Sequence, residues 1–95
     1  MKAQLIRHSK VIEDDGGIIE IRLWRAVLSP VKPHGVKYSL VYIVDGMRVI
    51  GYDNAEGKGD HRHYNALTER YEFKGLRKLA DDFYKDIEKY KKGLL

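Results

Sequence analysis

Two short turns rich in aspartate and glycine most constrain the fold of this chain. Residues 14–17 (Asp-Asp-Gly-Gly) and the pair Asp45-Gly46 each separate two runs that are rich in β-branched and aromatic residues. An Asp-Gly pair between such runs is typical of a β-hairpin, because both central residues accept a positive φ. The sequence therefore predicts two hairpins, joined by a loop that contains both prolines. The four strands are expected at residues 5–12, 18–28, 36–44 and 47–52.

Alternation along these runs predicts which side chains share a face of the sheet. Ile19, Ile21 and Leu23 point to one side, and the intervening polar residues and Trp24 point to the other. Both faces of the second hairpin are fairly apolar, which is typical of central strands. A two-residue turn at Asp45-Gly46 would pair Val44 with Met47, Tyr42 with Val49 and Leu40 with Gly51.

The second half of the chain changes pattern. Residues 53–65 break the strand pattern, and a short strand is expected at 70–73. Residues 74–92 predict a helix with one apolar stripe, and Gly93 is a suitable C-terminal cap. We therefore expect an α+β fold over residues 1–95: a single domain with an antiparallel sheet of four or five strands, covered by one C-terminal helix. The stripe consists of Leu76, Leu79, Ala80, Phe83, Ile87 and Tyr90.

Composition narrows the possible compartments and partners. The chain contains no cysteine, which excludes disulfides and thiolate metal sites. No run of apolar residues is long enough for a signal peptide or a membrane span, so we expect a cytoplasmic protein without a membrane partner. A net charge of +4 favours an anionic partner such as RNA, DNA or an acidic protein. The excess of positive charge is modest, because the chain has 14 acidic residues beside 18 basic ones. A local cluster of basic residues must therefore identify the binding site.

Such a cluster lies at residues 57–64, Gly-Lys-Gly-Asp-His-Arg-His-Tyr. Cleavage of RNA without a metal needs a base, an acid and cations that stabilise the phosphorane. We expect His61 and His63 to be the acid and base, and Lys58 and Arg62 to supply the charge. In an extended segment both histidines share one face, and Arg62 would need a bend to join them. The binding residues are expected to be Gly57 and Gly59 near the phosphate, Asp60 orienting a histidine, Asp53, and Tyr64 or Trp24 positioning a base.

Two other interpretations of this segment stay open. The His-x-His pair could bind zinc or manganese with Asp53, Asp60 or His34, although no further ligand has a diagnostic spacing. The segment could also be a solvated polar loop whose histidines cap backbone groups. Trp24 could likewise pack beneath the proline loop or the helix instead of stacking on a base.

Residues 49–54 (Val-Ile-Gly-Tyr-Asp-Asn) followed by 57–63 resemble the central signature of the TumE-like toxin family. Residues 12–14, 19–21, 24–25 and 38–42 resemble that family as well, so the likeness covers nearly the whole chain. The resemblance implies a toxin of a toxin–antitoxin module, neutralised by a small antitoxin from the neighbouring gene. It names no catalytic residue.

These observations favour a toxin that acts on RNA as a metal-independent ribonuclease, with no cofactor. One alternative is a toxin or regulator that binds nucleic acid or protein through the same basic loop without catalysis. Another is an interaction protein whose sheet edge accepts a strand from a partner. Homo-oligomerisation is compatible with each of these alternatives.

Overall fold

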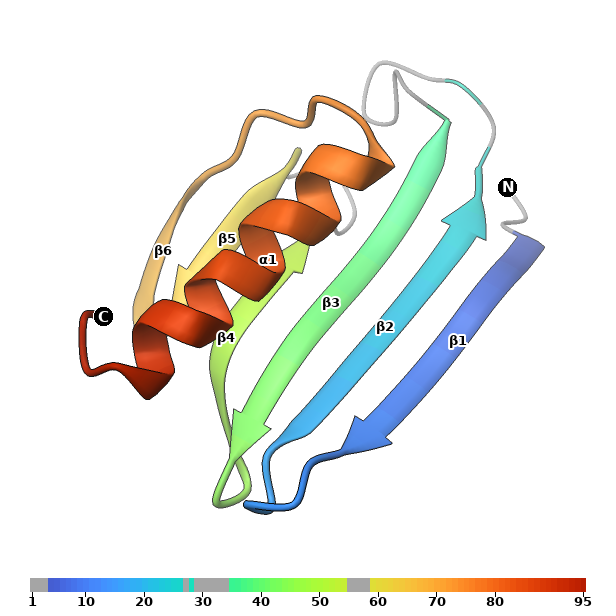
Figure 1. Ribbon diagram of the computed structural model, residues 1–95. Helices are drawn as coiled ribbons and strands as arrows, with labels where there is room; N and C mark the ends of the chain where they lie inside the picture. The colour runs from blue at the N-terminus through green and yellow to red at the C-terminus, as the bar shows by residue number, and fades with distance from the viewer. Residues whose placement is uncertain (1–3, 27, 29–34, 55–58) are drawn as a thin grey trace.

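The computed structural model describes residues 4–26, 28, 35–54 and 59–95. It confirms the α+β class: an antiparallel sheet is covered on one face by a C-terminal helix (Figure 1). The sheet has six strands rather than four or five, and they are ordered along it as they are in the chain. The elements are β1 (Gln4–Ile12), β2 (Ile18–Arg25), β3 (Val36–Val44), β4 (Met47–Asp53), β5 (His61–Tyr64), β6 (Leu67–Arg70) and α1 (Leu76–Lys91).

The hydrophobic core lies between the sheet and α1. The helix crosses the sheet over β4, and β1 and β2 extend beyond it (Figure 1). The predicted inward positions Ile19 and Ile21 are buried, whereas Arg22 on the opposite side is exposed. The other face of the sheet, which we call the open face, has no helix over it in the described part of the chain. The buried apolar residues are Ile19, Ile21, Tyr38, Leu40, Tyr42, Val49, Ile50, Tyr52, Leu79, Phe83 and Ile87.

A β-bulge changes the predicted pairing of β3 with β4. Tyr42 pairs with Ile50 rather than with Val49, and the following pairs are displaced by one residue as well. Of the three predicted pairs, Val44 with Met47 is therefore confirmed, and the pairs predicted for Tyr42 and Leu40 are wrong. Because side chains alternate between faces, this slip places Ile50 and Tyr52 in the core and Gly51 on the open face. Because of the bulge, Gly51 lies opposite His63 of the neighbouring strand β5.

The chain after β4 forms a third hairpin that the sequence did not predict. Residues 61–64 and 67–70 are paired strands, with Tyr64 opposite Leu67. The expected break over 53–65 and the expected strand at 70–73 are therefore wrong in these positions. Asn65 lies in the turn with a φ of 51°, a left-handed conformation that asparagine accepts more readily than most residues.

The helix is close to its prediction but contains one unexpected residue. It ends in a Schellman motif, in which Gly93 (φ 71°) donates to the Tyr90 carbonyl and Leu94 donates to the Lys89 carbonyl. The cap predicted at Gly93 is thus confirmed. The buried face includes a carboxylate, Asp86, beside Leu79, Phe83 and Ile87. In the described ranges, no helix has the length and hydropathy to cross a membrane.

Candidate functional site

The two histidines of the predicted cluster lie side by side on the open face. Both are on β5, two residues apart, and their ring centroids are 5.8 Å from each other. In the register of the sheet, His61 stands between Asp53 of β4 and Arg70 of β6. The extended conformation thus gives the two rings a common face, as the alternation of a strand requires.

His63 is held in place through both of its ring nitrogens. Its Nε2 lies 3.0 Å from Asp53 Oδ2, and its Nδ1 lies 3.0 Å from Thr68 Oγ1. Because a carboxylate only accepts, the Nε2 nitrogen carries the proton and donates it to Asp53. Asp53 is therefore the carboxylate that orients a histidine, a role that we expected of Asp60. Asp60 instead accepts a 2.6 Å hydrogen bond from the Tyr38 hydroxyl.

His61 is the more available of the two rings. Among the residues that the structure describes, it has no hydrogen-bond partner for its ring. It opens into a cavity of about 210 Å³ that is also lined by Thr68, Glu69 and Arg70. A partly exposed imidazole without a fixed partner can exchange protons with a bound molecule.

Gly51 allows Arg48 to lie beside His63. A Cβ atom added at Gly51 would lie 3.1 Å from Arg48 Cδ and 3.4 Å from His63 Cδ2. The arginine side chain therefore packs over the glycine, next to the imidazole. Arg48, Thr68 and Arg70 are further candidate residues that the sequence analysis missed, because the bulge and the third hairpin bring them to β5.

The open face carries polar side chains across much of the sheet. The register aligns Arg22, Ser39, Asp53, His61 and Arg70 in one row from β2 to β6. Trp24 lies on the same face, with Lys37 Nζ 5.1 Å from its ring centroid. It therefore does not pack beneath the helix, which covers the opposite face. It stands three strands, or about 14 Å, from β5, so it is separate from the histidine pair.

Arg62 lies on the opposite side of β5, where it faces the helix. Its Nε donates to Glu69 Oε1 at 2.5 Å, and its Nη1 donates to the Tyr52 hydroxyl at 3.1 Å and lies 3.5 Å from Asp86. Burial alone would lower the pKa of Arg62, but the bonds to Glu69 and Tyr52 raise it. The guanidinium is therefore a permanent cation within the packing of the helix. The bend that would bring it to the histidines does not occur, so the structure does not bring Arg62 together with them.

The tyrosines around Arg62 belong to the same packing. Tyr52, which is fully buried, donates to Asp86, and burial followed by this carboxylate raises the pKa of its hydroxyl. The Arg62 guanidinium carbon lies 4.5 Å from the ring centroid of Tyr64. Burial, then the Asp86 carboxylate, raises the pKa of Tyr64 to about 12. Tyr64 thus lies on the helix side of β5, and the histidines lie on the open face.

The remaining predicted residues divide into described and undescribed ones. Gly59 has a φ of 71°, in the region that favours glycine. Gly57 and Lys58 lie outside the described residues, as does His34 of the metal interpretation. Over the described ranges, no group of three or more potential ligands is placed to hold a metal ion.

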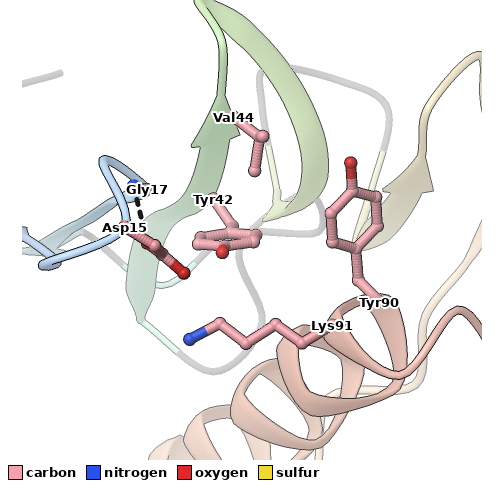
Figure 2. Close-up of a pocket in the computed structure, with 6 residues that line it drawn as sticks. All are labelled: Asp15, Gly17, Tyr42, Val44, Tyr90 and Lys91. Atoms are coloured by element: carbon pink, nitrogen blue, oxygen red, sulfur yellow. Dashed lines mark hydrogen bonds between the residues drawn. The ribbon is translucent and has the colours of Figure 1, made fainter.

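A larger cavity lies at the other end of the helix, away from the histidine pair. Its volume is about 360 Å³, and it is lined by the turn after β1, by β3 and by the end of α1. Figure 2 shows the Lys91 side chain extending beneath the ring of Tyr42 toward that turn. Lys91 Nζ donates to Glu13 Oε2 at 3.0 Å, which connects the end of the helix to the first hairpin. The lining residues are Asp15, Gly17, Tyr42, Val44, Tyr90 and Lys91.

Comparisons with known proteins place the chain in a family. A search of curated proteins and a search of solved structures each return no match. A family model described as Toxin TumE matches residues 2–91, which is nearly the whole chain. The likeness therefore extends over every described strand and the helix, including the histidine pair on β5 and the bulge in β4. By this match, the chain belongs to the TumE toxin family.

Proposed function

We propose that this toxin belongs to a toxin–antitoxin module and acts on RNA as a metal-independent ribonuclease. One observation carries the proposal: two imidazoles lie 5.8 Å apart on the uncovered face of the sheet, one anchored by a carboxylate and the other without a hydrogen-bond partner among the described residues. The net charge of +4 supports an anionic substrate. We propose no cofactor for the reaction.

The His61 ring, which lines the cavity on β5 and β6, suits the base of this reaction. It would take the proton from the ribose 2′-hydroxyl, whose oxygen then attacks the phosphorus and displaces the 5′-oxygen of the next nucleotide. The products are a 2′,3′-cyclic phosphate and a 5′-hydroxyl. The 2′-hydroxyl occurs in RNA and not in DNA, so the proposed chemistry selects RNA.

His63 suits the acid. When protonated, it donates from Nε2 to Asp53 and from Nδ1 to Thr68 Oγ1. Exchange of Thr68 for the leaving 5′-oxygen would let the Nδ1 proton pass to that oxygen. Asp53 would stabilise the cationic ring and keep its orientation, as a carboxylate does for a catalytic histidine.

Two arginines suit the stabilisation of phosphate charge. Arg48 lies against the His63 side of the pair, and Arg70 lines the cavity beside His61. Preorganised cations at these positions would stabilise the phosphorane as its charge develops. They replace Arg62 in the role that the sequence suggested. Lys58 stays a candidate contact on the segment before β5.

The two hydrogen bonds of the His63 ring favour a second candidate function, RNA binding without cleavage. Both ring nitrogens already have partners, so a toxin with a purely structural His63 would have only one histidine for proton transfer. Such a protein would occupy RNA through the same arginines and block its use. Binding would then depend on Arg48 and Arg70 and would weaken steeply with salt.

Incubation of the purified protein with total RNA in EDTA tests the proposal. We expect cleavage that falls about 100-fold or more in His61→Ala, because general acid–base catalysis contributes about that much. The matched control is His8→Ala, a histidine of the edge strand β1 that hydrogen-bonds Glu20 at 2.7 Å. Intact RNA, or equal cleavage by both variants, would contradict the proposed catalysis. If the wild-type protein binds RNA without cleaving it, and the double variant Arg48→Ala with Arg70→Ala does not bind it, the binding function is favoured.

A further inference from the structure

The first strand is an unusually open edge. β1 has nine residues, eight of them exposed, and within the described ranges its one neighbouring strand is β2. The helix covers it on neither side (Figure 1). Its backbone therefore presents a row of donors and acceptors that another strand can use.

The exposed side chains of β1 include aliphatic residues on both faces. Leu5, Ile6, Val11 and Ile12 are between 46% and 68% exposed. Proteins usually protect a long apolar edge by shortening it, charging it or covering it. The opposite edge is short, because β6 has only four residues, whereas β1 carries charges only in its middle and keeps nine residues with aliphatic side chains toward both ends. The length and the aliphatic side chains of β1 are consistent with an edge that is covered in a complex.

The charges on β1 indicate what covers it. Arg7, His8 and Lys10 lie within the strand, which has no acidic residue. Arg7 pairs with Leu23 and Lys10 with Glu20, so cations extend from both faces of the edge. Antiparallel pairing of β1 with a second copy would bring these cations together, and like charges on paired strands destabilise a sheet. An incoming strand with acidic and β-branched residues has the complementary pattern.

We propose that β1 accepts, as a seventh strand of the sheet, an acidic β-forming segment of the protein that neutralises this toxin. The identity of that partner rests on the proposed toxin–antitoxin function, whereas the location and the charge pattern rest on β1. Backbone hydrogen bonds would supply affinity, and Arg7 and Lys10 would select an acidic strand.

The test uses the full chain and the protein encoded by the adjoining reading frame. Binding is measured by titration calorimetry for wild type, for Arg7→Glu with Lys10→Glu, and for Lys85→Glu with Lys89→Glu. The last pair makes the same change of charge on exposed helix residues. We expect Kd to rise at least about tenfold for the β1 variant and to stay unchanged for the helix variant. Circular dichroism checks that both variants are folded.

Hydrogen exchange on the wild-type complex makes the result independent of the variants. We expect new protection of amides within residues 4–12. Absence of a complex, equal affinity of both variants, or protection confined to β5 and β6 would overturn the proposal. A wild-type dimer that the β1 substitutions dissociate would also overturn it, in favour of a second copy as the occupant. RNA cleavage by the same variants reports separately on the proposed ribonuclease, since neither Arg7 nor Lys10 belongs to that site.

Discussion

Replacing Asp86 by alanine separates the structural side of β5 from its proposed functional side. The Asp86 side chain is 4% exposed, accepts the hydroxyl hydrogen of Tyr52 and lies 3.5 Å from Arg62 Nη1. The substitution removes these two interactions and the effect of the carboxylate on Tyr64, but it changes nothing on the open face. We therefore expect a loss of stability without a loss of RNA cleavage by the folded protein.

The size of the loss follows from the groups left behind. The Tyr52 hydroxyl is fully buried and would lose its acceptor, which costs about 1–3 kcal/mol. Arg62 would keep its bond to Glu69, so its charge is only partly unpaired and adds less than the full cost of a broken buried pair. We expect a decrease of about 3 kcal/mol in the free energy of unfolding. For a chain of this size that corresponds to roughly 12–24 °C in Tm.

Thermal and urea unfolding followed by circular dichroism measure this effect. Asp86→Asn is the matched control, because its amide oxygen still accepts from Tyr52 while the charge is lost, and we expect about half the decrease. Glu69→Gln, on a side chain that is 43% exposed, should cost less than about 1 kcal/mol. If Asp86→Ala unfolds within about 0.5 kcal/mol of wild type, the network around Arg62 does not stabilise the fold.

Three further substitutions or conditions give sharp outcomes. Gly51→Ala should leave stability nearly unchanged, since the flexible Arg48 side chain can move from the 3.1 Å contact, but it should lower RNA cleavage about tenfold or more in the same RNA assay. The free energy of unfolding should fall between about pH 10 and about pH 12, because the fold raises the pKa of Tyr64 to about 12. A raised pKa stabilises the fold at lower pH, and this stabilisation is lost as the pH rises through the pKa. Tyr64→Phe should reduce this fall. Gly93→Ala should cost about 1 kcal/mol in urea unfolding, because its φ of 71° is strained for alanine.

The sequence predicted the elements whose signals are local. Asp45-Gly46 marked the hairpin because both residues tolerate a positive φ, and both have one in the structure. Gly93 marked the helix end for the same reason. The helical spacing of apolar residues located α1 to within two residues at its start and one at its end.

The bulge in β4 could not be predicted, because two adjacent apolar residues, Val49 and Ile50, fit either face equally well. Only burial against the helix decides that Ile50 and Tyr52 point inward. The third hairpin had one usable signal, Asn65, but its strands of four residues are too short for a clear alternation.

The geometry of the candidate cluster was predicted in part, and its role stays a prediction. Placing His61 and His63 on a common face follows from strand alternation alone. Arg48 rather than Arg62 lies beside the histidines, and Asp53 rather than Asp60 orients one of them. Both outcomes depend on which strands are neighbours in the sheet. Asp86 lies in an apolar stripe and finds its partners on β4 and β5, so its burial is a property of the tertiary structure.

The most direct measurement is an NMR titration of the histidine ring protons with a short single-stranded RNA in EDTA, with the 2′-hydroxyl at the target nucleotide replaced by hydrogen to prevent cleavage. If the open face holds the phosphate, we expect the signals of His61 and His63 to shift and the side-chain Nε signal of Arg62 to stay in place. Shifts at Arg62 without shifts at the two imidazoles would contradict the separation of the two sides of β5. The absence of any shift would contradict the central claim that the open face binds RNA.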